Sequence, residues 1–460
     1  MPKKNDIITL KIEDLTNLGF GVGKSCGMVV FVQDAVPEDT VSARIIKATS
    51  SYCVARLERI ITPSPMRTEA RCSNTRCRSC AYKNVPYECE LNFKRDDIRN
   101  AFVKAGLCDV TVPPVNPSPS ELGYRNKAQY PVRQTKDGEY VIGFFAPKSH
   151  NVTEASDCPL SHPDFHAVLT TLRELFYEYS IPAYDEKSGG GIIRHIYMRR
   201  SHESGKILLT LVINSDTLPH ADALCERISH AHPYVSGIML NINKADTNVI
   251  LGQRWQRLFG DDYILDTLGG VRLKITAPSF YQVNHDVADA IYARARELAS
   301  LTREDTLLDL FCGTGSIGLS MARDAGEVIG IEIIPDAIRC AEENAHLNGI
   351  ENAHFFVGNA TDTRGLLASA EAELGRKISP TVVVLDPPRA GCDGELIKFV
   401  SEISPKRVVY ISCNPQTLAR DVKVFFELGY TTKQVEGWDM FALTGHVESV
   451  VCLTRSDKAT

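Results

Sequence analysis

The sequence has no uninterrupted apolar run that approaches the ~20 residues needed to cross a bilayer, so we expect no transmembrane helix. The opening residues, MPKKNDIITL, include lysines but no apolar stretch with a small-residue cleavage site behind them, and we expect no signal peptide. Internal repeats and low-complexity tracts are also missing. The composition, 43% hydrophobic and 23% charged, is ordinary for a globular protein and excludes a disordered, collagen-like or rod-shaped chain.

Cysteine and charge are present in informative patterns. Fourteen cysteines without a secretory signal indicate a reducing compartment, so we expect a cytoplasmic protein in which some thiols bind metal or act in catalysis. Residues 1–150 contain 22 Lys and Arg against 16 Asp and Glu, whereas residues 151–460 contain 29 against 41. A basic N-terminal third is compatible with nucleic-acid binding, because cationic side chains displace counterions from phosphates.

The length of 460 residues is enough for about three domains. Residues 1–65 contain short alternating strands broken by glycines, which predicts an OB-like β-barrel. Residues 66–275 combine a cysteine-rich segment, a helix that ends at Gly106 and mixed strands and helices, so we expect a central α+β domain. Residues 276–460 alternate apolar strands with helices, which predicts an α/β fold with a doubly wound, mainly parallel sheet.

A glycine-rich loop, Phe311 to Gly318, follows the predicted strand TLLDL and precedes an apolar helix. It fits GxGxxG, and Glu332 ends the next strand, where its carboxylate can accept both hydroxyls of a ribose. NAD and S-adenosylmethionine both suit such a loop. Asp309, just ahead of it, would repel a pyrophosphate and attract the cationic end of S-adenosylmethionine, so we favour the methyl donor. A glycine turn without a ligand is the alternative.

Two later strands end in residues suited to catalysis. In an open α/β sheet, ligands bind at the carboxyl ends of the strands. Asp386 and Arg389 follow one strand in the motif DPPR, and Cys413 follows the strand VVYIS. Buried cysteines usually pack as small apolar side chains, as we expect for Cys312. Cys413 lies at the exit of its strand, which is where a nucleophile would be placed.

A methyl donor beside a cysteine nucleophile suggests a reaction at C5 of uracil. That carbon is too weak a nucleophile to take a methyl group until a thiolate adds to C6, and covalent catalysis divides the reaction into easier steps. A base within hydrogen-bond reach must then remove the C5 proton. Our candidate is Glu448 in TGHVESVV, with an exposed strand glutamate in an ion pair as the alternative.

Cys72, Cys77 and Cys80 form a C-x4-C-x2-C motif, and Cys158 in the turn SDCPLSHP is a candidate fourth ligand. Closely spaced cysteines in a reducing compartment predict a metal site. The spacing suits both zinc held by four thiolates and an iron–sulfur cluster, and does not choose between them. The surrounding basic residues indicate that this segment binds phosphates: Arg67, Arg71, Arg76, Arg78 and Lys83.

In their order along the chain, these motifs resemble the bacterial RNA (uracil-5-)-methyltransferase family, in particular its ribosomal RNA branch. The resemblance covers almost the whole sequence and is carried by YRNKAQYPV, LNINKADTNVILG, SFYQVN, FCGTGSIG, DPPRAG, SCNPQTLARD and HVESV. It implies an N-terminal TRAM domain, which is an OB-like RNA-binding module. It also implies a C-terminal class I S-adenosylmethionine-dependent methyltransferase domain with a Rossmann-like fold.

The resemblance also implies roles for single residues. Cys413 would be the thiolate that attacks C6, and Glu448 would be the proton acceptor. Six residues would line the S-adenosylmethionine pocket: Gln282, Phe311, Ser316, Glu332, Asn359 and Asp386. Asn359 stands where the family often has Asp. A 4Fe–4S cluster would be held by Cys72, Cys77, Cys80 and Cys158, although Cys72 and Cys77 are one residue closer together than in the family.

The resemblance implies an RNA substrate, most specifically 23S rRNA, because the transfer-RNA branch usually lacks both barrel and cluster. A duplex hides C5 and C6, so we expect the target uridine in a loop and flipped out of its stack. We further expect a monomer without a membrane partner. The competing hypotheses are an iron–sulfur oxidoreductase that uses flavin or NAD, a non-catalytic RNA-binding factor, and a methyltransferase that acts on an exocyclic amine.

Overall fold

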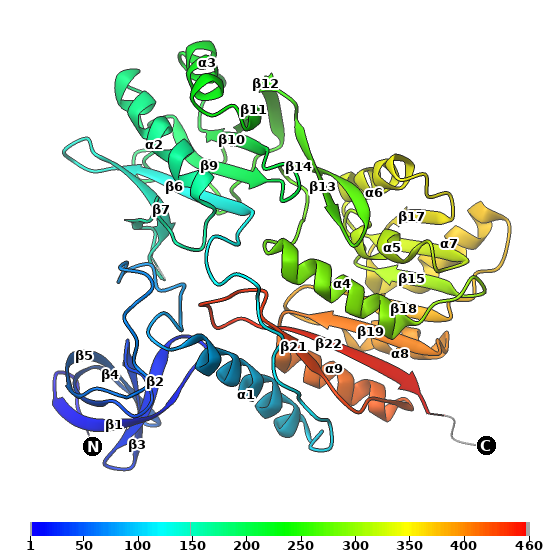
Figure 1. The fold of residues 1–460 in the computed structure, drawn as a ribbon, viewed down its shortest axis with the longest axis horizontal. Helices are drawn as coiled ribbons and strands as arrows, with labels where there is room; N and C mark the ends of the chain where they lie inside the picture. Colours follow the sequence, from blue (N-terminus) through cyan, green and yellow to red (C-terminus); the bar gives the residue numbers. More distant parts are fainter. Residues whose placement is uncertain (1, 148, 457–460) are drawn as a thin grey trace.

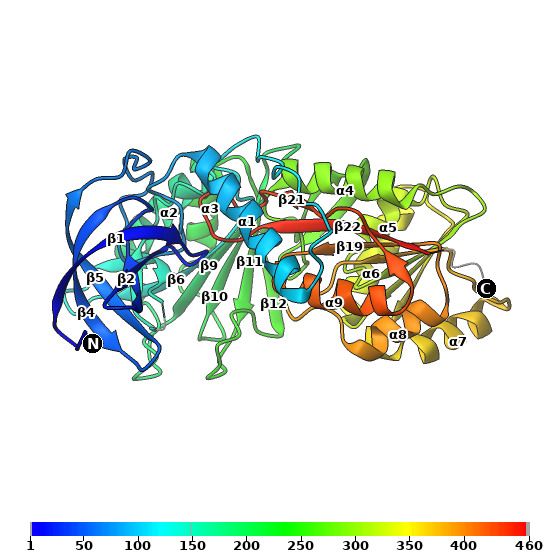
Figure 2. The ribbon, with the colours of Figure 1, turned by 90° about the horizontal axis from the view of Figure 1, so that it is seen from below.

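The computed structural model describes residues 2–147 and 149–456. Figure 1 shows three parts: an N-terminal barrel, a central sheet with two helices, and a C-terminal α/β sheet. Seen from below in Figure 2, the molecule is elongated, with the barrel at one end and the α/β sheet at the other. In the part of the chain that the structure describes, no helix is long and apolar enough to span a membrane.

The N-terminal barrel closes in the strand order β1-β2-β3-β5-β4. Its strands are β1 (Ile7–Leu15), β2 (Phe20–Ser25), β3 (Met28–Gln33), β4 (Thr40–Ala48) and β5 (Tyr52–Thr62). Alternate residues of β3 are buried, as the period of two in a strand requires. In β2 the chain approaches its neighbour so closely that a Cβ on Gly23 would lie 2.4 Å from the backbone oxygen of Lys11. The predicted OB-like barrel is confirmed.

Helix α1 (Tyr87–Ala105) connects the barrel to the C-terminal part of the molecule. It ends at Gly106, which adopts the left-handed conformation with φ of 84°, as the sequence predicted. Ile98 and Phe102 of this helix are fully buried in a core that they share with the C-terminal sheet. Helix α1 therefore fixes the cysteine-rich segment before it against the C-terminal sheet.

The central sheet has seven strands in the order β12-β11-β10-β9-β6-β7-β8. These are β6 (Lys127–Gln134), β7 (Tyr140–Phe145), β8 (Val152–Glu154), β9 (Ile193–Arg200), β10 (Ile207–Ile213), β11 (Val235–Ile242) and β12 (Arg254–Gly260). Helices α2 (Pro163–Glu178) and α3 (Ala221–Ala231) share a hydrophobic core with it. A hairpin of β13 (Tyr263–Leu268) and β14 (Val271–Thr276) follows and packs into the C-terminal core.

The C-terminal sheet has the order β17-β16-β15-β18-β19-β22-β20, with β21 paired to β22. Its strands are β15 (Thr306–Leu310), β16 (Glu327–Glu332), β17 (Ala353–Val357), β18 (Val382–Leu385), β19 (Arg407–Ser412), β20 (Tyr430–Thr431), β21 (Glu436–Trp438) and β22 (Glu448–Arg455). Strands β15 to β19 pair in parallel, and β22 is antiparallel to β19. The predicted doubly wound sheet is confirmed.

Helices cover this sheet between its strands. They are α4 (His285–Ala299), α5 (Ser316–Met321), α6 (Pro335–Leu347), a short 3-10 turn (Ala360–Asp362), α7 (Thr363–Leu374), α8 (Gly394–Glu402) and α9 (Pro415–Glu427). The strand order reverses direction at β15, between β16 and β18. This is the topological switch point at which open α/β sheets bind ligands.

Candidate active site

The glycine-rich loop turns sharply between β15 and α5. Gly313 and Gly315 have φ angles of 55° and 78°, and Phe311 also has a positive φ, of 66°. A Cβ on Gly315 would lie 3.1 Å from both the Ala341 side chain and the Phe355 ring. The loop therefore needs glycine for its conformation and for the close packing of α5, which brings backbone N–H groups to the mouth of the sheet.

Glu332 lies at the end of β16, directly beside this loop. Its two carboxylate oxygens accept hydrogen bonds from the backbone N–H groups of Gly313 (3.2 Å) and Ile334 (3.0 Å). The side chain is thus oriented by the backbone on both sides and is only half-buried, so free lone pairs remain for a ligand. This is the position from which a carboxylate could bind the hydroxyls of a ribose.

Asp309, the carboxylate just ahead of the loop, is less accessible than the sequence suggested, and its role toward a cofactor stays a prediction. Its side chain is fully buried and accepts a hydrogen bond from the backbone N–H of Gly318 at 2.8 Å. Its pKa is raised to about 7, mainly by burial and also by the charges of Asp386 and Glu332, while the hydrogen bond from Gly318 opposes the shift. The carboxyl group is therefore turned into the loop, where it supports helix α5, instead of lying open at the mouth of the sheet.

Cys413 lies in the turn between β19 and α9, where the local sequence explains its position. Asn414 caps α9 by accepting a hydrogen bond from the N–H of Gln416, and Pro415 occupies the first turn. The thiol is half-buried and lines a cavity of about 170 Å³ together with Arg389 and His446. Cys312, by contrast, is buried in the hydrophobic core, which confirms that it is a packing residue.

Glu448 is the first residue of β22 and is only 5% exposed. Its pKa is raised to about 8, first by burial and then by the charge of Asp386, while Arg389 opposes the shift. The pKa of Cys413 is raised to about 11 by burial and by Glu448. These mutual effects place Cys413, Glu448 and Asp386 in one electrostatic cluster, which combines a thiol with two carboxyl groups that titrate near neutral pH.

Arg389 is the cation beside this cluster, and His446 is its neighbour. Nη2 of Arg389 lies 3.3 Å from Nε2 of His446, and Asn414 donates a hydrogen bond to the backbone oxygen of Arg389. Although the His446 ring reaches solvent, partial desolvation and the charges of Arg389 and Lys94 lower its pKa to about 4. A neutral His446 can accept a hydrogen bond from Arg389, which stays free to stabilise a negative charge in the cavity.

Two residues that the sequence did not single out also line the Cys413 cavity. Asn17 comes from the turn between β1 and β2, and Asp97 comes from α1. Asp97 accepts hydrogen bonds from Asn17 (3.4 Å) and Gln416 (3.0 Å). Nothing in the local sequence could have placed these residues beside Cys413, because the contact depends on how barrel, helix and sheet pack together.

The remaining candidate cofactor residues have separate surroundings. Ser316 hydrogen-bonds to the hydroxyl of Tyr292 at 2.9 Å, at the first residue of α5. The backbone oxygen of Gln282 accepts a hydrogen bond from the Asn126 side chain at 2.8 Å. Asn359 is exposed just after β17. Asp386 lies directly after β18, and burial raises its pKa to about 7. The contacts of all four residues with a cofactor stay predictions.

The four cysteines of the predicted metal site converge. Cys72, Cys77, Cys80 and Cys158 line one cavity of about 320 Å³. Burial raises the pKa of Cys80 to about 12, and the other three cysteines add to the shift. The pKa of neighbouring Arg125 is raised by Tyr124 and by Cys158 and Cys80, against its burial. A half-buried cation beside four thiols is a charge arrangement that suits an anionic metal–thiolate centre.

The sulfur atoms do not form a compact single-ion site. Among the described residues, the only group of three or more ligating atoms within 4.8 Å of one another consists of His202, His285 and Asp286. A zinc ion with four thiolates at about 2.3 Å would hold the sulfurs about 3.8 Å apart.

Known proteins share both the sequence and the fold. Residues 238–456 match the family described as tRNA (Uracil-5-)-methyltransferase, and residues 3–57 match the TRAM domain. The chain is 38% identical to an uncharacterized RNA methyltransferase of Halalkalibacterium halodurans, over 98% of this chain and 97% of that protein. It is also 38% identical to an uncharacterized RNA methyltransferase of Clostridium acetobutylicum, over 99% and 98% of the two chains.

The structure is similar to that of the Pyrococcus abyssi tRNA (uracil-54, C5)-methyltransferase in complex with S-adenosyl-L-homocysteine. The TM-score is 0.75 and the identity 25%, over 97% of this chain and 100% of that one. Fold and site together define an S-adenosylmethionine-dependent methyltransferase that acts on RNA. The chain belongs to the RNA (uracil-5-)-methyltransferase family and has an N-terminal TRAM domain.

Proposed function

We propose that this protein transfers the methyl group of S-adenosylmethionine to C5 of a uridine in RNA, with Cys413 as nucleophile and Glu448 as base. The observation that carries the proposal is the electrostatic cluster of Cys413, Glu448 and Asp386 at the carboxyl ends of β18 and β19, in the sheet that also bears the glycine-rich loop. S-adenosylmethionine supplies an electrophilic methyl group there when bound.

Cys413 begins the reaction. Its thiolate adds to C6 of uracil, which forms an S–C6 bond and moves the electron pair of the C5–C6 double bond to C5 as an enolate. C5 then takes the methyl group, and the methyl–sulfur bond breaks. Arg389, in the same cavity as the thiol, is the cation that would stabilise the negative charge on the substrate.

Glu448 completes the reaction. Its carboxylate removes the remaining proton from C5, the C5–C6 double bond re-forms, and the S–C6 bond breaks to release Cys413. Because burial raises the pKa of Glu448 to about 8, its carboxylate is a stronger base than an ordinary glutamate once it has lost its proton. A bound sulfonium cation beside these acidic groups would lower their pKa values and favour the ionised, reactive forms.

The substrate we propose is 23S rRNA, with the target uridine flipped out of a loop and with the reaction located in the cytoplasm. The motifs of the ribosomal branch and the cysteine quartet support this substrate. The Pyrococcus abyssi tRNA (uracil-54, C5)-methyltransferase aligns over 97% of this chain, so the barrel does not discriminate between the two RNAs. Position 54 of tRNA is therefore the second candidate.

We also propose that Cys72, Cys77, Cys80 and Cys158 hold a 4Fe–4S cluster. The cavity that the four cysteines share and the half-buried Arg125 that lines it support the assignment. When bound, such a cluster would cross-link the segment before α1 to the turn at Cys158, and methyl transfer itself needs no net electron. The four thiolates would thus stabilise the fold around the RNA site.

Mass spectrometry of total RNA from cells with and without the protein tests the proposed reaction and substrate. We expect one or more 5-methyluridines in 23S rRNA to disappear when the gene is deleted and to return with the wild-type chain but not with Cys413→Ala. If 5-methyluridine is lost from tRNA alone, position 54 of tRNA is the substrate and 23S rRNA is not. Unchanged 5-methyluridine in both RNAs would contradict the proposed reaction.

A further inference from the structure

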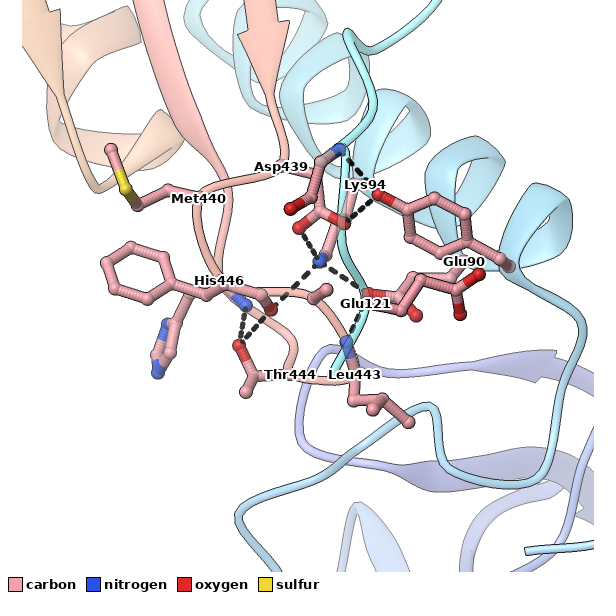
Figure 3. A network of polar contacts seen from close by, with 12 residues as sticks. Glu90, Lys94, Glu121, Asp439, Met440, Leu443, Thr444 and His446 are labelled. Atoms are coloured by element: carbon pink, nitrogen blue, oxygen red, sulfur yellow. Dashed lines mark hydrogen bonds and ion pairs between the residues drawn. The ribbon is translucent and has the colours of Figure 1, made fainter. Parts of the chain in front are cut away.

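Residues 439–447 form a segment between β21 and β22 that leads directly into Glu448. Gly445, His446 and Val447 of this segment line the Cys413 cavity. The position of this segment therefore sets where the candidate base and the wall of the cavity lie. Figure 3 shows that the segment is bound from the side by helix α1, through a network of buried polar contacts.

Lys94 of α1 makes the central contacts. Its ammonium group lies 2.5 Å from the carboxylate of Asp439 and 2.7 Å from that of Glu90, and it donates a hydrogen bond to the backbone oxygen of Phe441 at 3.2 Å. The side chains of Lys94 and Glu90 are 1% and 0% exposed. Glu90 in turn accepts a hydrogen bond from the N–H of Leu443 at 2.7 Å.

Neighbouring elements bind other polar groups of the same segment. The Tyr87 hydroxyl donates a hydrogen bond to Asp439 at 2.6 Å, and the backbone N–H of Tyr82 donates to the oxygen of Leu443 at 3.0 Å. Tyr124 binds the backbone oxygen of Ala442 at 3.0 Å. The segment is thus held at successive residues by contacts from outside it, mainly from residues 82–94.

The network continues to the cysteine-rich segment. Nη2 of Arg71, the residue before Cys72, lies 3.6 Å from the carboxylate of Glu90, and Arg71 also forms an ion pair with Glu121. Arg71 lines the cavity of the four cysteines as well. A continuous set of contacts therefore joins the cysteine cavity to the segment before Glu448.

Buried ion clusters of this kind are a poor route to stability alone, because the desolvation of each charge offsets the attraction between them. They do fix geometry, since each charged group accepts only a narrow range of partner positions. We propose that Lys94 and Glu90 are positioning residues that hold segment 439–447, and through it Glu448, in the geometry for proton removal, with Arg71 linking this clamp to the cysteine segment. The inference rests on the proposed function for its catalytic part only.

The first test measures the clamp without catalysis. In Lys94→Met, amide hydrogen exchange within residues 439–447 should accelerate at least about tenfold, while β19 and β22 stay protected. Lys104→Met, an exposed lysine on the same helix, is the matched control and should leave exchange unchanged. The paired variant Lys94→Met with Asp439→Asn removes one positive and one negative charge and leaves Glu90 opposite Arg71. It therefore remains testable if the single variant fails to fold.

The second test separates positioning from a merely structural effect. Single-turnover kinetics with S-adenosylmethionine and RNA measure formation and release of the covalent protein–RNA adduct. In the Lys94 variants, release of the adduct should slow at least about tenfold more than its formation, because a misplaced base affects proton removal. The affinity for S-adenosylmethionine should change less than about twofold. Lys94→Arg should restore part of the release rate.

If amide hydrogen exchange within residues 439–447 is unchanged in a folded Lys94→Met protein, the clamp is overturned. The same holds if adduct formation and adduct release slow by equal factors. The wild-type reaction distinguishes the two proposals. If the wild-type chain forms neither adduct nor 5-methyluridine, the proposed function fails, and the exchange experiment still decides whether the clamp exists.

Discussion

Asn17 of the barrel lies directly against Gly445 of the segment before Glu448: its backbone oxygen would be only 1.6 Å from a Cβ on Gly445. Both residues line the cavity of Cys413. The barrel therefore closes one side of the candidate catalytic cavity and is not merely attached to the enzyme. Leu18, the next residue, is 72% exposed at the same turn, where an RNA strand that enters the cavity would cover it.

Gly445→Ala tests this contact. The added methyl group must displace the barrel turn, so we expect a loss of about 1–3 kcal/mol in the free energy of unfolding and at least a tenfold lower rate of RNA adduct formation. Chemical denaturation and single-turnover assays measure the two effects. Gly394→Ala is the control, because nothing lies within 4 Å of a Cβ at Gly394. Wild-type adduct formation in Gly445→Ala would show that the contact is dispensable.

Glu332→Gln tests the cofactor site. The amide keeps the size of the side chain but loses the charge and one acceptor, so binding of ribose hydroxyls should weaken. We expect S-adenosylmethionine affinity, measured by titration calorimetry, to fall about tenfold or more. Glu351→Gln, on the exposed loop before β17, should bind as the wild type does. Equal affinity of both variants for S-adenosylmethionine would show that Glu332 does not bind the cofactor.

The titration of Glu448 predicts how stability depends on pH. Its folded pKa of about 8 lies above the ordinary value, so between about pH 4.5 and 8 the folded state holds a proton that the unfolded state has lost. The free energy of unfolding should therefore fall as pH rises through this interval. Glu448→Gln should reduce that slope and be more stable than the wild type at pH 8 by at least about 1 kcal/mol. Parallel pH curves for the two proteins would contradict the burial of this carboxyl group.

The cysteine quartet predicts a metal-dependent fold. Cys80→Ser should lose iron and sulfide in elemental analysis and unfold at lower denaturant concentration, because a ligand and its cross-link are removed. Cys108→Ser, which replaces an exposed cysteine, should retain both. If the purified wild-type protein contains one equivalent of zinc and no sulfide, the four cysteines hold a zinc ion and the proposed cluster is wrong.

The sequence predicted those features that depend on local patterns. The strand TLLDL, the positive-φ glycines that follow it and the helix end at Gly106 were all recognisable, because backbone conformation and burial period leave a local signature. The burial of Asp309 was not recognisable in this way, because its hydrogen bond to Gly318 depends on the shape of the turn.

Contacts between distant segments had no such signature. Glu90 and Lys94 look in the sequence like an ordinary i,i+4 pair on a solvated helix face, yet packing of α1 against the C-terminal sheet buries both. Asn17 is similarly unremarkable until the barrel turn meets Gly445. These positions are defined only when three separately folded parts come together.

The central claim is that Cys413 and Glu448 act in sequence on one uridine. The most direct measurement is intact mass spectrometry of protein denatured after incubation with S-adenosylmethionine and substrate RNA. We predict that Glu448→Gln accumulates a covalent adduct containing methylated RNA, that the wild type shows little, and that Cys413→Ala shows none while it still binds the cofactor. An adduct in Cys413→Ala, or methylated RNA released by that variant at the wild-type rate, would contradict the account.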